Sequence, residues 1–192
     1  ITGEMGVAVQ SHWFSVGSLV IWGKAGVGVV ATQSFVNPSF GPRGISLLEN
    51  GLTPKLAVKT LLELDESREV RQLAILDAYG NVEAFTGINC IDEAGHIVGN
   101  NFSVQANLMD KNTVWPAMAE AFKNAVKSLG NTFGRSLNRN FKFDFIDLFG
   151  LNKNNLDNKC PRLGTLQDTF CPNVATLFNC KLTVSVAKLM YL

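Results

Sequence analysis

The fold is decided between residues 6 and 44, where the chain reads GVAVQSHWFSVGSLVIWGKAGVGVVATQSFVNPSFGPRG. Two short runs rich in valine, Gly6–Val9 and Gly26–Ala31, predict strands because β-branched side chains favour extended backbone. Each run ends in a polar cluster, Gln10-Ser11-His12 after the first and Thr32-Gln33-Ser34 after the second. Enzymes commonly hold reactive groups where rigid strands end, so this stretch predicts a functional end of a β-sheet.

The composition predicts a globular protein of one domain, with or without an extension. The chain has 192 residues, 46% of them hydrophobic and 17% charged, which is enough to bury a full core. The formal net charge is +1 and no block of Lys or Arg occurs, so we expect no nucleic-acid or anionic-membrane partner. The most apolar window, Val16–Ala31, is interrupted by Lys24 and four glycines, which argues against a membrane-spanning helix.

The cysteine pattern predicts no metal centre, and we expect no cofactor. Cys90, Cys160, Cys171 and Cys180 form no CxxC pair and have no close histidine, unlike the ligands of structural zinc. Free buried thiols are the simpler interpretation, and disulfides stay open for a secreted protein. The chain begins at Ile1 without a signal-like segment, so we expect a cytoplasmic protein whose native N-terminus lies upstream.

The first third predicts three strands followed by two helices. The strands are expected at Gly6–Gln10, Phe14–Trp22 and Gly26–Gln33, with a loop from Asn37 to Pro42. A short helix around Ile45–Leu48 can end at Gly51 in the left-handed conformation. Thr53-Pro54 then caps and starts a second helix that ends near Asp65, where we expect the acidic residues between 63 and 69 to lie in solvent.

The middle of the chain predicts a β-hairpin, one more strand and an amphipathic helix. The hairpin joins Val70–Asp77 to Val82–Thr86 through Tyr79-Gly80-Asn81, and residues 90–99 follow as a loop. After a strand at Phe102–Leu108, the segment Thr113–Lys127 places five side chains on one helical face: Trp115, Met118, Ala119, Phe122 and Val126. Residues 1–127 are therefore predicted to form one α+β domain of sheets layered with helices.

Residues 128–192 differ in character and are predicted to be a divergent extension. Asparagines alternate with phenylalanines there without a sustained helical or strand period. Two segments fit regular structure, Phe141–Phe149 as a short strand and Leu182–Leu192 as a terminal strand or helix. The extension carries no chemical motif, so its fold stays open.

Short motifs are spread densely over the first 127 residues. They include Gly3–Phe14, Gly26-Val27-Gly28, Ala31–Ser34, Asn37-Pro38, Gly41–Gly44, Val70-Arg71-Gln72, Thr86-Gly87, Cys90-Ile91, Ala94-Gly95-His96, Gly99 and Phe102–Gln105. This set resembles domain-of-unknown-function family 1028, an uncharacterised and mostly bacterial and archaeal family of the N-terminal nucleophile (Ntn) hydrolase clan. Some of its members are labelled fimbrial-assembly-like. The resemblance implies a four-layer αββα sandwich, in which two facing sheets lie between outer helices.

The resemblance also implies amide-bond hydrolysis by the first residue of the mature chain, and here the sequence departs from the family. In the clan, an N-terminal Thr, Ser or Cys attacks the amide carbonyl while its own α-amine serves as the base. Ile1 has no nucleophilic atom and Thr2 carries an amide, so we expect the catalytic threonine and its strand upstream. Strands that would complete the sandwich after the Thr113–Lys127 helix are not apparent in the sequence either.

We therefore expect a fragment of a hydrolase that acts on small amide or peptide-like compounds and lacks its nucleophile. Two alternatives stay open on the same fold, a non-catalytic small-molecule-binding module and a surface-assembly protein. Self-association is common in proteins of this clan, and the sequence fixes no stoichiometry.

The candidate substrate-binding residues lie near the ends of the predicted strands. They are Ser11, His12, Gln33, Ser34, Asn37, Arg43 and Asn107. Adjacent residues on an extended chain point to opposite sides, so Ser11 and His12 form no catalytic dyad. Asn37 and Asn107 are candidate oxyanion donors, and Arg43 is a candidate partner for a substrate carboxylate. Simpler roles stay open for them, such as turn formation by Asn37, hydrogen bonds to backbone by Gln33 and Ser34, and a local contact for His96.

Overall fold

Two four-stranded antiparallel sheets face each other in the computed structural model, which describes residues 5–11, 13–133 and 183–189, with side chains up to residue 126. One sheet has the strand order β2 (Ile21–Lys24), β3 (Gly28–Ser34), β4 (Arg71–Asp77) and β5 (Val82–Thr86). The other has the order β1 (Met5–Gln10), β8 (Thr183–Leu189), β7 (Phe102–Asn107) and β6 (Gly95–Gly99). All neighbouring strands in both sheets run antiparallel.

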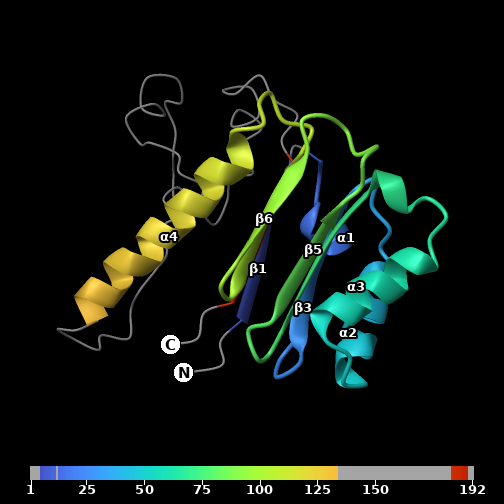
Figure 1. The fold of residues 1–192 in the computed structure, drawn as a ribbon, viewed down its shortest axis with the longest axis horizontal. Coiled ribbons are helices and arrows are strands. Elements are labelled where there is room, and N and C mark those ends of the chain that lie inside the picture. The colour runs from blue at the N-terminus through green and yellow to red at the C-terminus, as the bar shows by residue number, and fades with distance from the viewer. Residues whose placement is uncertain (1–4, 12, 134–182, 190–192) are drawn as a thin grey trace.

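Helices cover the outer faces of both sheets (Figure 1). Helices α2 (Phe40–Glu49) and α3 (Pro54–Glu63) pack on the sheet that contains β3 and β4, and α4 (Val114–Phe133) packs on β6 and β7. A short helix α1 (Gly17–Val20) and a 3₁₀ turn (Arg68–Val70) lie in the connections. The layers therefore follow the order helix, sheet, sheet, helix, and the predicted α+β class is confirmed.

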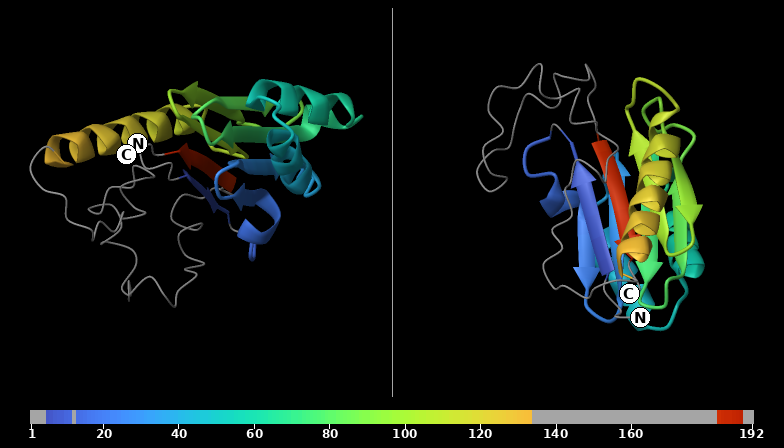
Figure 2. Two further views of the ribbon diagram at one scale, coloured as in Figure 1. Left: turned by 90° about the horizontal axis from the view of Figure 1, so that it is seen from below. Right: turned by 90° about the vertical axis from the view of Figure 1, so that its left-hand side faces the viewer.

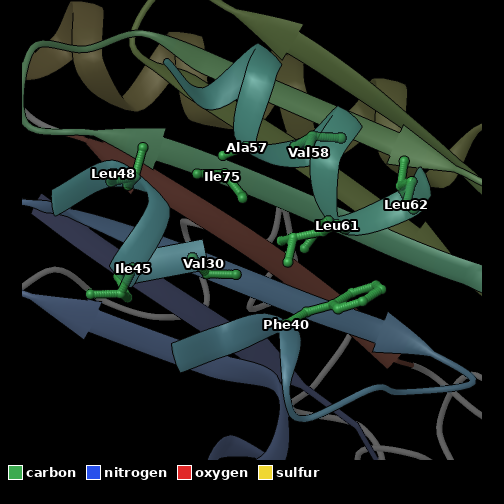
Figure 3. Packing of buried hydrophobic residues seen from close by; sticks show 10 residues of the cluster. Val30, Phe40, Ile45, Leu48, Ala57, Val58, Leu61, Leu62 and Ile75 are labelled. Carbon is green, nitrogen blue, oxygen red and sulfur yellow. The ribbon is translucent and has the colours of Figure 1, made fainter. Parts of the chain in front are cut away.

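Alternation along the strands separates side chains that face the helices from side chains that face the other sheet. Val30 and Ile75 point toward α2 and α3, where they meet Phe40, Ile45, Leu48, Ala57, Val58, Leu61 and Leu62 (Figure 3). Their neighbours Val29 and Leu76 point between the sheets, toward Met5, Val7 and Val82. Fully burying one large apolar side chain contributes about 1.5–3 kcal/mol, so these two cores account for much of the stability.

The turn between α2 and α3 forms as the sequence predicts. Gly51 has a φ of +82°, and its N–H donates to the Leu48 carbonyl at 2.9 Å, which ends α2 in the left-handed conformation. The Thr53 hydroxyl accepts from the Leu56 N–H at 3.4 Å, and Pro54 is the first residue of α3. Both helix ends are therefore determined by local residues.

Helix α4 docks on its sheet through the face that its periodicity predicts. Met118, Ala119 and Phe122 are buried against β7, and the Phe122 and Phe102 ring centroids lie 4.6 Å apart. Val126 follows on the same face and is 41% exposed, because the core ends before that turn of the helix. The helix continues to Phe133, six residues beyond its predicted end.

Two segments of the N-terminal stretch differ from their predictions. The segment Phe14–Trp22 was expected to be one strand, but Ser15 has a φ of +54°, α1 follows, and only Ile21–Lys24 is extended. Gly41-Pro42 was expected in a loop and instead lies in the first turn of α2. Proline fits there because the first N–H groups of a helix have no intrahelical partner.

The predictions are also wrong for residues 90–99, of which 95–99 form strand β6 paired with β7. Among residues 128–192, Thr183–Leu189 form β8, which lies between β1 and β7 (Figure 2). This agrees with the predicted choice of a terminal strand or helix at 182–192. Phe141–Phe149 lies outside the described residues, and the boundary at residue 127 stays a prediction.

Over the described residues, no helix is both long enough and apolar enough to cross a membrane.

Candidate functional site

Polar side chains gather between the two sheets at one end, where β3, β5 and β7 finish and β4 and β6 begin. Gln33 is paired in register with Gln72, Gln72 with Thr86, and His96 with Gln105. Buried carboxamides dominate this end, and we call four of them the amide cluster: Gln33, Gln72, Gln105 and Asn107. Each of the four is at most 2% exposed, so the polar end lies inside the molecule.

Gln72 is the centre of the amide cluster. Its Nε2 donates to the carbonyl oxygens of Ala106 at 2.9 Å and Gly95 at 3.2 Å, and to the Thr86 hydroxyl at 2.9 Å. Its Oε1 accepts from Gln33 Nε2 and, at 3.1 Å, from Asn107 Nδ2. Carbonyl oxygens can only accept, which fixes the orientation of the Gln72 amide. One side chain on β4 thus binds residues of four other strands in both sheets.

Several atoms of this end have no hydrogen-bond partner. They are Gln33 Oε1 and both amide atoms of Gln105, each with almost no exposed surface. Buried polar groups in proteins are nearly always hydrogen-bonded, to protein, to ordered water or to a ligand. These atoms are therefore candidates for hydrogen bonds to ordered water or to a ligand. Both side chains are uncharged, which suits a neutral ligand better than an ionic one.

Thr86 and His96 add a hydroxyl and an imidazole to the polar end. Thr86 Oγ1 lies 2.8 Å from His96 Nδ1. Burial lowers the pKa of His96 below its ordinary value of 6.5, and the charge of Glu83 opposes that shift. The imidazole is therefore neutral at pH 7 and can accept a proton.

An ion pair and a buried thiol lie near the start of β4. Arg71 Nε donates to Asp65 Oδ2 at 2.8 Å, and this hydrogen bond lowers the pKa of Asp65. The sequence predicted that Asp65 lies in solvent, and this prediction is wrong.

Cys90 is buried and donates through Sγ to the Arg71 carbonyl. Burial raises the pKa of this thiol, although the Ser34 hydroxyl acts in the opposite direction, so Cys90 is not an activated nucleophile. The other three cysteines lie outside the described residues.

The structure brings some of the predicted site residues together and separates others. Gln33 and Asn107 are both bonded to Gln72 in the amide cluster, and Ser34 follows Gln33 at the end of β3. Ser11 is buried just after β1 and accepts from the Trp13 N–H at 3.1 Å. His12 lies outside the described residues, as do Ile1 and Thr2.

Asn37 and Arg43 belong to the other side of the β3–β4 sheet. Asn37 Oδ1 accepts from the Ser39 N–H and hydroxyl, at 3.2 and 2.8 Å, in the turn that leads into α2. Arg43 lies in α2 itself, which covers the face of the sheet that points away from the amide cluster. The sheet therefore separates these two residues from the four amides.

Sequence reasoning missed Gln72, Gln105 and Thr86. A signal for Gln105 was available in the alternation along β7. Every second residue is polar, namely Ser103, Gln105 and Asn107, and the apolar residues between them face α4. Gln72 gives no comparable signal, since it is the second residue of β4 and four apolar residues follow it.

An open cleft of about 460 Å³ lies elsewhere, beside α3 and β5. It is lined by Lys55, Val58, Lys59, Leu62, Glu63, Arg68, Glu83, Ala84 and Phe85. Within the described part of the chain, no hydrogen bond joins a residue of this cleft to the amide cluster. The cleft and the amide cluster are therefore separate sites.

The fold and the site define an α+β protein with a buried, uncharged polar site between two facing sheets. The model of the family described as "Family of unknown function (DUF1028)" matches residues 1–139, and the chain belongs to this family. Among solved structures, it is similar to the crystal structure of protein SPO2555 from Silicibacter pomeroyi, described with the same family. The identity is 31% and the TM-score 0.60, over 64% of this chain and 54% of that one. The chain thus spans about half the length of that protein. No curated protein matches it.

Proposed function

We propose that the chain is the scaffold of an Ntn-type hydrolase of small amide or peptide-like compounds. The single observation that carries the proposal is the amide cluster with its unpartnered atoms, buried between two sheets that are themselves enclosed by helices. The order of the layers is the one that the resemblance to the Ntn clan implies. In this proposal the attacking residue is a threonine upstream of Ile1, because the clan uses the first residue of the mature chain.

The chemistry of the cluster supports a neutral amide as the substrate. A carboxamide presents one acceptor oxygen and up to two N–H donors, which complement Gln33 Oε1 and the Gln105 amide. A charged substrate group would be desolvated here without a counter-charge from the four amides, which would weaken its binding. Gln33 and Asn107 therefore become substrate-positioning residues in the proposed site.

The test is made on protein from the complete coding sequence. A panel of primary amides and small peptides is incubated with it, and the released amine or ammonia is quantified. We expect hydrolysis that is lost when the upstream threonine is replaced by valine, and a raised KM in Gln33→Leu. Asn50→Ser serves as the control, because Asn50 is exposed at the end of α2. Hydrolysis that survives the threonine replacement would overturn the mechanism.

The same experiment addresses a second function, a non-catalytic binding module. The unpartnered Gln105 amide favours it equally, since a ligand can satisfy these atoms without reacting. A panel compound that raises the melting temperature of the wild type but not of Gln33→Leu, with no amine released, would favour binding over catalysis. If no compound binds or reacts, both functions fail.

A further inference from the structure

One side-chain hydrogen bond joins the two sheets at the edge that β5 and β6 share. Thr86 ends β5 and His96 is the second residue of β6, and their Oγ1 and Nδ1 atoms lie 2.8 Å apart. The two strands belong to different sheets but run beside each other (Figure 1). Both residues are only half-buried, unlike the four amides behind them, so part of each residue is in contact with solvent.

The Thr86 hydroxyl lies between an amide donor and the imidazole of His96. Gln72 Nε2 donates to Thr86 Oγ1 at 2.9 Å, so this oxygen is already an acceptor. Among the described residues, His96 Nδ1 is the acceptor within hydrogen-bond distance of the hydroxyl. In the neutral tautomer that carries its proton on Nε2, His96 Nδ1 accepts from this hydroxyl, and the dyad depends on this form. Burial favours that neutral form.

The groups that pack around His96 complete the arrangement. Glu83 on β5 supplies the charge that acts on the imidazole, whereas β4 and β7 present the neutral side chains of Gln72 and Gln105. Gln105 is the direct register partner of His96, and directly paired residues of antiparallel strands project to the same side. Its Nε2 is buried and has no partner, which leaves an N–H donor free beside the hydroxyl–imidazole pair.

We propose that Thr86 and His96 form a nucleophile–base dyad that transfers the acyl group of small neutral esters or amides. As Thr86 Oγ1 attacks the carbonyl carbon, its proton moves to His96 Nδ1 and a C–O bond forms. The resulting oxyanion accepts from Gln105 Nε2. The bond to the leaving group then breaks, and the leaving oxygen or nitrogen takes the proton from His96. Water, deprotonated by His96, finally hydrolyses the acyl-Thr86 ester.

This dyad lies within the described chain and needs no residue upstream of Ile1. It therefore goes beyond the proposed function, and the two can fail independently. Loss of amide hydrolysis on replacing the upstream threonine says nothing about Thr86, and acylation of Thr86 requires only the 192-residue chain.

The test uses the 192-residue chain with 4-nitrophenyl acetate as the probe. We expect a burst of 4-nitrophenol and an acetyl group on the peptide that contains Thr86, located by mass spectrometry. Thr86→Val, which keeps the shape of the side chain, should abolish the burst, and Thr86→Ser should restore it. His96→Gln should lower the acylation rate about 100-fold, the usual size of a general-base effect. The wild-type rate should fall as the pH drops through the pKa of His96, which burial places below 6.5, because the base becomes protonated.

Melting curves of each variant show that it is folded, and Asn50→Ser is the control outside the site. An acetyl group on lysine or His96 but not on Thr86 would overturn the proposal. A burst that survives Thr86→Val in folded protein would overturn it as well. If Thr86→Val does not fold, His96→Gln and the location of the acetyl group still decide, since acylation that is insensitive to His96→Gln contradicts the dyad.

Discussion

At the scale of single residues, the amide cluster contains two buried glutamines with opposite hydrogen-bond status. Gln72 uses both ends of its amide, whereas neither amide atom of Gln105 has a partner. Replacing Gln72 by leucine removes the hydrogen bonds that the Ala106 and Gly95 carbonyls accept from its amide. We therefore expect Gln72→Leu to lower the free energy of unfolding by about 2–4 kcal/mol. Urea denaturation of the purified variant measures this loss.

Gln105→Leu is the matched comparison, because it makes the same chemical change at an equally buried site. Removing an unsatisfied amide costs no hydrogen bond, so we expect a change between zero and a gain of about 1.5 kcal/mol. The same variant should lose the proposed acyl transfer. Equal destabilisation in both variants would show that the two glutamines are bonded alike.

His96 gives the stability a dependence on pH. Its pKa is lower in the folded protein than the ordinary 6.5, so the folded state binds fewer protons than the unfolded state. The contribution of neutral His96 is fully present above pH 6.5 and is lost as the pH falls through the folded pKa. We expect the free energy of unfolding to decline on acidification below 6.5, and His96→Gln to decline less. Parallel curves for both proteins would refute this. Asp65, whose pKa lies below 3.8, acts only at lower pH.

At the scale of elements, the docking of α2 depends on a glycine. A Cβ on Gly41 would lie 2.2 Å from carbons of the Trp22 ring, well inside contact distance. We expect Gly41→Ala to push the indole away and to cost about 1–3 kcal/mol of stability, visible in denaturation curves together with a shift of tryptophan fluorescence. In Gly17→Ala the nearest atom is an ordinary 3.8 Å away, so this control should change stability by about 0.5 kcal/mol at most.

The elements that could be predicted from the sequence are those whose ends are set locally. Thr53-Pro54 and Gly51 determine where α3 starts and α2 ends, and the hairpin of β4 and β5 has its own turn. Strand β6 escaped prediction because its five residues include two glycines and a histidine, and its extension depends on pairing with β7. The bend at Ser15 has no sequence signal, since serine rarely adopts a positive φ.

At the scale of the whole molecule, the two sheets differ in how the chain builds them. The sheet of β2 to β5 comes from one continuous stretch, residues 21–86. The other sheet combines strands that are far apart in the sequence, β1 with β6, β7 and β8. Strand β3 is almost wholly buried, and β1 is half-buried along its length. We expect amides of β3 and β4 to exchange hydrogen only by global unfolding and those of β1 to exchange faster. Hydrogen exchange read by NMR tests this, and equal protection of β1 and β3 would contradict it.

The candidate site could be predicted only in part from the sequence, because its side chains meet across two sheets. Gln33 and Asn107 stand at strand ends where the sequence draws attention to them, and the structure joins them through Gln72. That junction bridges two sheets, and a pattern within one strand contains no information about what faces it. Arg43 and Asn37 attracted attention through glycine and proline neighbours, which reflect the start of α2 rather than the space between the sheets.

The bridging position of Gln72 also has a consequence for the order in which the protein matures. On the ribosome, β2 to β5 and their helices can assemble as soon as residue 86 has emerged, since their contacts are local. The acceptors of the Gln72 amide on β6 and β7 arrive later, and β1 gains its partner β8 only after residue 189 is made. The four amides can meet only once residue 107 has emerged, so a shorter nascent chain lacks the polar end and stays inert toward amides and esters.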